Sequence, residues 1–120
     1  MVLEATTTLV HIPIDDIALE GLLTIPEKTR GFVLFAHGSG SNRHSPRNEF
    51  VAKKLQHAGL GTLLFDLLSD SEVREDELTQ HFRFDILFLS KRLLAVTHWV
   101  KHQETLRDLK LGYFGASTGA

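Results

Sequence analysis

Two uninterrupted apolar runs, residues 32–36 and 60–65, constrain the fold of this chain most. Neither run alternates with polar residues, which is typical of strands that are covered on both faces. Between them, Val51, Leu55 and Ala58 repeat at helical spacing, and Gly59 ends the pattern. A strand, a helix and a second buried strand in this order predict a parallel α/β unit with a right-handed crossover.

The flanking segments extend this unit in both directions. Residues 6–12 are rich in β-branched side chains and predict a strand, and residues 17–25 predict a second strand, joined to the first by a hairpin turn at 13–16. A helical repeat within 84–105 and a last strand at 109–114 follow the acidic stretch 69–77, which we interpret as a solvated loop or a surface helical turn, with a flexible cover over a pocket as the alternative. The predicted helical face of residues 84–105 consists of Ile86, Leu89, Leu93, Val96 and Val100. We therefore expect one α/β domain over residues 1–120, with a mostly parallel sheet, an antiparallel N-terminal hairpin and helices on both faces.

Composition excludes several classes of function. A net charge of −2 provides neither the basic surface of a nucleic-acid-binding protein nor a polybasic membrane patch. The chain has no cysteine, so it can form no disulfide and no zinc–thiolate site. The N-terminal residues lack the pattern of a signal peptide, and the apolar runs are too short to cross a bilayer. We expect a cytoplasmic protein without nucleic-acid or membrane partners; its oligomeric state does not follow from the sequence.

The predicted last strand runs directly into the pentapeptide Gly115-Ala116-Ser117-Thr118-Gly119, which has the form G-x-S-x-G. In a strand–turn–helix context this pattern is typical of a nucleophile elbow, a sharp turn that exposes the serine hydroxyl. The flanking glycines suit a turn where a Cβ would clash with neighbouring backbone. We predict that Ser117 is a catalytic nucleophile; the alternative is a glycine-rich turn with an inert serine.

A second glycine-rich segment, beginning at His37, follows the strand at 32–36. An acyl-transfer serine needs two backbone N–H groups directed at the oxyanion, one from the residue after the nucleophile and one from a loop after an earlier strand. The candidates are the main-chain N–H groups of Thr118 and Ser39. A phosphate cradle is the rival interpretation, but neither G-x-G-x-x-G nor G-x-x-x-x-G-K-[ST] is present.

Other polar residues are weaker candidates. We interpret His37 as a structural histidine of the loop and Asp66 as a turn or capping residue at the end of its strand. Arg43 and Arg83 are candidates for binding a substrate carboxylate, with solvent-exposed arginines as the alternative. The pair His98 and His102 has helical spacing but no third ligand in a zinc pattern, so we expect no metal site, and nothing points to a cofactor.

Taken together, four segments of the chain resemble the dienelactone hydrolase branch of the α/β-hydrolase superfamily: residues 35–48, 64–68, 81–85 and 114–120. The resemblance covers nearly the whole chain as far as the elbow. It implies a serine hydrolase of small-molecule esters or lactones, with Ser117 as nucleophile and Ser39 and Thr118 as oxyanion donors. Some relatives carry this domain next to a phosphoribosyltransferase domain, which nothing in this chain resembles.

The resemblance also implies a catalytic acid and a histidine after the elbow, whereas the printed sequence ends at Ala120. We expect either a piece of a longer protein or a truncated reading frame, with little or no turnover by these 120 residues alone. The alternative from another functional class is a non-catalytic remnant that acts as a binding or assembly piece.

Overall fold

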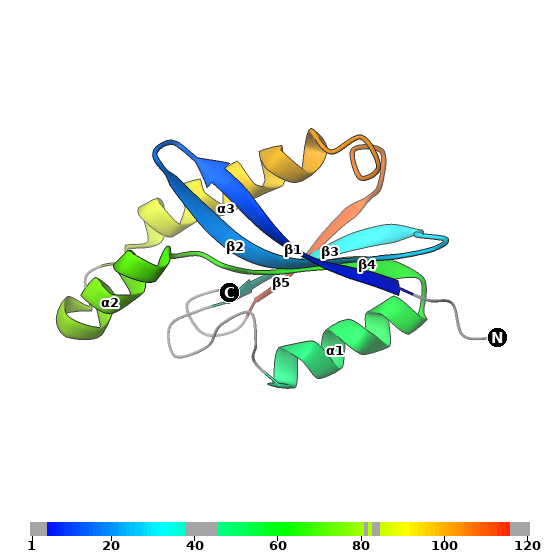
Figure 1. The fold of residues 1–120 in the computed structure, drawn as a ribbon, viewed down its shortest axis with the longest axis horizontal. Helices are drawn as coiled ribbons and strands as arrows, with labels where there is room; N and C mark the ends of the chain where they lie inside the picture. Colours follow the sequence, from blue (N-terminus) through cyan, green and yellow to red (C-terminus); the bar gives the residue numbers. More distant parts are fainter. Residues whose placement is uncertain (1–4, 38–45, 81, 83–84, 116–120) are drawn as a thin grey trace.

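The computed structural model describes residues 5–37, 46–80, 82 and 85–115 and contains a five-stranded sheet with three helices (Figure 1). The strand order across the sheet is β1-β2-β4-β3-β5. The strands are β1 (Ala5–Ile14), β2 (Ile17–Pro26), β3 (Gly31–His37), β4 (Leu60–Asp66) and β5 (Leu111–Gly115). The helices are α1 (Pro46–His57), α2 (Asp70–Thr79) and α3 (Ile86–Lys101).

Three neighbouring strands, β4, β3 and β5, run parallel to one another. The hairpin of β1 and β2 joins this parallel unit through an antiparallel pairing of β2 with β4. Its far strand, β1, forms one edge of the described sheet. The predicted α/β fold with an antiparallel N-terminal hairpin is therefore confirmed.

The hairpin is longer than predicted, because β1 continues through Pro13 and pairs as far as Ile14 with Ile17. Proline cannot donate to a strand ladder, but an edge strand has neighbours on one side only and tolerates it. The turn is therefore shorter than the predicted residues 13–16. Asp15 lies in it with φ 52°, a left-handed conformation that aspartate adopts more readily than most residues.

Helices cover both faces of the sheet, as predicted (Figure 1). On one face Ala52 of α1 packs with Phe35 and Leu64, and on the other Leu89, Val96 and Val100 of α3 belong to the larger core cluster. The predicted helical faces are wrong at two residues. Ala58 lies after the end of α1 and is exposed, and Ile86 is 65% exposed because it precedes the part of α3 that packs on the sheet.

The acidic stretch forms a surface helix, α2, which is consistent with the predicted surface helical turn but extends over three turns. The second predicted helix ends at Lys101 rather than near residue 105, and hydrogen-bonded turns lead from there to Leu109. The last strand begins at Leu111 rather than at residue 109. None of the described helices combines the length and the hydropathy that a bilayer-spanning segment requires.

Candidate active site

The carboxyl ends of the three parallel strands lie together along one side of the sheet, and open α/β sheets bind their ligands at these strand ends. His37, the last residue of β3, pairs with Asp66, the last residue of β4. One residue earlier on β3, Ala36 pairs with Gly115, the last residue of β5. The three strands therefore end nearly level with one another, and β3 lies between the other two.

All five predicted site residues lie outside the part of the chain that the structure describes. Ser39 and Arg43 follow β3 in the sequence, Ser117 and Thr118 follow β5, and Arg83 lies between α2 and α3. The structure does describe the strand that precedes Ser39 and Arg43 and the strand that precedes Ser117 and Thr118. Those strands, β3 and β5, are parallel neighbours in the sheet.

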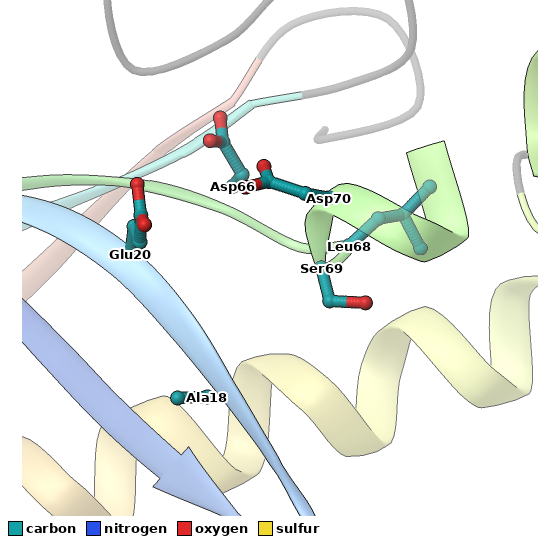
Figure 2. Close-up of a pocket in the computed structure, with 6 residues that line it drawn as sticks. All are labelled: Ala18, Glu20, Asp66, Leu68, Ser69 and Asp70. Carbon is teal, nitrogen blue, oxygen red and sulfur yellow. The ribbon is translucent and has the colours of Figure 1, made fainter. Parts of the chain in front are cut away.

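The described part of this edge contains a small pocket beside the end of β4 (Figure 2). It is lined by Ala18, Glu20, Asp66, Leu68, Ser69 and Asp70. Figure 2 shows Glu20 on β2 and Asp66 on β4, with Asp70 next to Asp66 at the start of α2. Asp66, which the sequence predicts as a turn or capping residue, ends β4 and lines this pocket, and Ser69 is the N-cap of α2.

The turn from β4 into α2 is closed by a capping box. The Ser69 side chain accepts a hydrogen bond from the Glu72 N–H at 3.4 Å, and the Glu72 carboxylate accepts one from the Ser69 N–H at 2.8 Å. Two helix-end donors are satisfied in this way, and the direction of α2 at the pocket is set. The pattern Ser-x-x-Glu, here Ser69 and Glu72, is the signal in the sequence that predicts this box.

Glu72 also forms a bidentate ion pair with Arg92 of α3, with oxygen–nitrogen distances of 2.8 and 2.7 Å. Burial by itself raises the pKa of Glu72, but the hydrogen bonds from Arg92 and Ser69 and the Arg92 charge outweigh it and lower the pKa below 4.5. Glu72 is therefore ionised at neutral pH. No sequence spacing indicated this contact, because the two residues belong to different helices.

The link between α2 and α3 is anchored at both ends. Asp76 is buried, and its carboxylate accepts a hydrogen bond from the Phe82 N–H at 2.9 Å. Asp85 caps α3 by accepting from the Phe88 N–H at 3.0 Å, and the Phe82 and Phe88 rings pack with their centroids 5.1 Å apart. Phe82 and Asp85, the described residues before and after positions 83–84, thus have defined positions.

The described residues include the pair His98 and His102, which is considered above as a metal site. His102 lies with its Nδ1 atom 2.6 Å from the His98 carbonyl oxygen, one helical turn away. Over residues 5–37, 46–80, 82 and 85–115, no group of three or more histidine, aspartate or glutamate residues could hold a metal ion. The His37 side chain lies outside the described part of the chain.

Known structures with a similar arrangement of strands and helices include hydrolases and esterases. A dienelactone hydrolase from Anabaena variabilis superposes with a TM-score of 0.91 at 50% identity, over 96% of this chain and 53% of that one. A cold-adapted esterase from an Arctic intertidal metagenomic library superposes with a TM-score of 0.73 at 17% identity, over 96% of this chain and 52% of that one, and shows the fold alone. The chain has a dienelactone hydrolase-like α/β-hydrolase fold and covers about half of the Anabaena structure.

Curated relatives from Mycobacterium tuberculosis are 50% identical over 111 residues, which are 92% of this chain. They bear the provisional name of phosphoribosyl transferase, and the chain spans about a quarter of their length, 24%. No protein-family model matches the chain.

Proposed function

We propose that this chain provides the nucleophile and the oxyanion hole of a serine hydrolase that cleaves a small-molecule ester or lactone. The observation that carries the proposal is the pairing of β3 with β5 as parallel neighbours, with Ala36 opposite Gly115. The segment with Ser39 and the segment with Ser117 therefore continue from adjacent strands at the same edge of the sheet. An oxyanion hole assembled from two loops requires this proximity.

In this mechanism the Ser117 hydroxyl attacks the acyl carbon, and the main-chain N–H groups of Ser39 and Thr118 stabilise the oxyanion of the tetrahedral intermediate. Each such donor lowers the barrier by about 3 kcal/mol. The intermediate collapses as the bond from the acyl carbon to the alcohol oxygen breaks, and the alcohol leaves with the proton taken from Ser117. Water then hydrolyses the acyl-enzyme and restores the serine. The similarity to a dienelactone hydrolase at 50% identity supports this reaction class over other chemistry on the same fold.

The base and the acid of the triad are proposed to come from residues after Ser117, the order that this architecture uses. The 120 residues alone then have little or no turnover, since a serine without its histidine retains only the rate enhancement of binding and oxyanion contacts. Arg43 and Arg83 are the proposed contacts of a substrate carboxylate, because a guanidinium binds a carboxylate with two parallel hydrogen bonds.

The phosphoribosyl transferase name of the curated relatives belongs to proteins about four times as long as the matched segment. If this segment contributed nucleotide binding through residues 38–41, a nucleotide would bind saturably, and Ser117→Ala would leave that binding intact. This outcome would favour a phosphate cradle over an oxyanion hole.

The proposal is tested by fluorophosphonate labelling of the full-length protein, with the modified residue located by peptide mass spectrometry. We expect labelling at Ser117 that Ser117→Ala abolishes. Ser90→Ala, a change at an exposed serine of α3, is the matched control and should label like the wild type. Absence of labelling in a folded full-length protein would favour a non-catalytic remnant that acts as a binding or assembly piece.

A further inference from the structure

Arg92 connects three elements through its guanidinium group. Its Nη1 atom donates to the Leu67 carbonyl after β4 at 3.1 Å and to Glu72 Oε1 of α2 at 2.8 Å, while Nη2 donates to Glu72 Oε2 at 2.7 Å. The guanidinium also lies over the Phe88 ring, 4.4 Å from its centroid. The side chains of Arg92 and Glu72 are only 11% and 16% exposed, so their hydrogen bonds are partly shielded from water.

These contacts close a ring around the β4–α2 turn. The same Glu72 oxygen that binds Arg92 Nη1 also accepts the Ser69 N–H, and Arg92 binds the carbonyl of Leu67 two residues earlier. Leu68, Ser69 and Asp70, which follow Leu67 in the sequence, form half of the pocket lining. One guanidinium therefore fixes the backbone that forms this wall.

Apolar packing among the described residues contributes little to the position of α2. Asp76 is the buried residue of this helix, and its apolar residues are exposed, Leu78 to 88%. The extensive contacts between described elements involve the strands, α1 and α3 rather than α2. Figure 1 shows α2 beyond one end of the sheet, with no strand against its length. The helix thus lacks the apolar stripe that docks most surface helices.

We propose that Arg92 is a positioning residue of the candidate active site. Acting through Glu72 and the Leu67 carbonyl, it holds the β4–α2 turn as a preformed wall beside the strand ends from which the proposed catalytic loops continue. The effect of Arg92 on catalysis rests on the proposed function. A lysine cannot replace it, because an ammonium group lacks the planar fork that binds two carboxylate oxygens and still reaches a carbonyl.

The positioning is tested first by hydrogen exchange of the full-length protein, independently of any activity. The variants are Arg92→Met and Arg92→Lys, with Lys91→Met, at an exposed position of the same helix, as the control. We expect exchange in residues 67–79 to accelerate about tenfold in both Arg92 variants while β3 and β4 are unchanged. Unchanged exchange in residues 67–79, or equal acceleration throughout the sheet, would overturn the proposal.

Ester hydrolysis by the same variants then tests the effect on the site. We expect KM to rise about fivefold or more with kcat within about twofold, since a displaced wall weakens binding before it affects the reacting atoms. Lys91→Met should keep both constants. An active enzyme whose Arg92 variants keep the wild-type KM would contradict a role in the site. A wild-type protein without hydrolase activity would instead refute the proposed function, and hydrogen exchange would still decide whether Arg92 holds the turn.

Discussion

At the scale of single residues, close packing distinguishes two glycines on the parallel strands β4 and β5, which lie on either side of β3. A Cβ on Gly61 of β4 would lie 2.6 Å from the Phe32 ring, whereas a Cβ on Gly112 of β5 would approach nothing closer than 3.9 Å. Because Phe32 is fully buried, its ring has no room to move away. We expect Gly61→Ala to lower the free energy of unfolding by about 1–3 kcal/mol. The control Gly112→Ala should change it by less than about 1 kcal/mol. Chemical denaturation of both variants measures the difference, and equal stabilities would show that Phe32 does not confine position 61.

At the scale of elements, the Glu72–Arg92 ion pair links α2 to α3, and this link should therefore depend on pH. The pKa of Glu72 is lower in the folded protein than its ordinary value of 4.5, so the carboxylate stabilises the folded state at neutral pH. This stabilisation is complete above the unfolded-state pKa and is lost as the pH falls through the lowered, folded-state pKa. We expect the stability difference between wild type and Glu72→Gln to stay constant from about pH 7 to 5 and to shrink below about pH 4. Urea denaturation across this range provides the measurement. If the stability difference already declines between neutral pH and about pH 6, the pH dependence arises from a group other than Glu72.

At the scale of the whole molecule, the two edges of the described sheet differ in their protection against association. The β1 edge contains Pro13, whereas β5 contains neither proline nor a charged residue, and its Tyr113 is 55% exposed. Unprotected edges pair with other chains, and a charged side chain opposes this. We expect the 120-residue chain to associate or to be marginally stable. Tyr113→Lys should reduce the association more than Leu9→Lys on β1, as measured by analytical ultracentrifugation. A wild-type monomer with a sharp, cooperative thermal transition would contradict this expectation.

Several features of this protein followed from its sequence alone, because they depend on local periodicity. The buried strands β3 and β4 are apolar runs without alternation, and the stripe of Leu89, Val96 and Val100 identified α3. Strand and helix ends were less accurate, since Pro13 is acceptable only on an edge strand, and whether a strand forms an edge is a property of the assembled sheet. The predicted roles of Ser117, Ser39 and Thr118 remain predictions.

What only the tertiary structure decided is which distant residues meet. Local patterns contain no information on the order β4-β3-β5, and this order makes the strands that precede the two proposed oxyanion donors direct neighbours. The Glu72–Arg92 pair likewise joins residues twenty positions apart. Its two partners belong to different helices, α2 and α3, and the local pattern of neither helix predicts their contact. Periodicity determines how each segment folds, whereas the sheet order and the helix packing determine which side chains share a site.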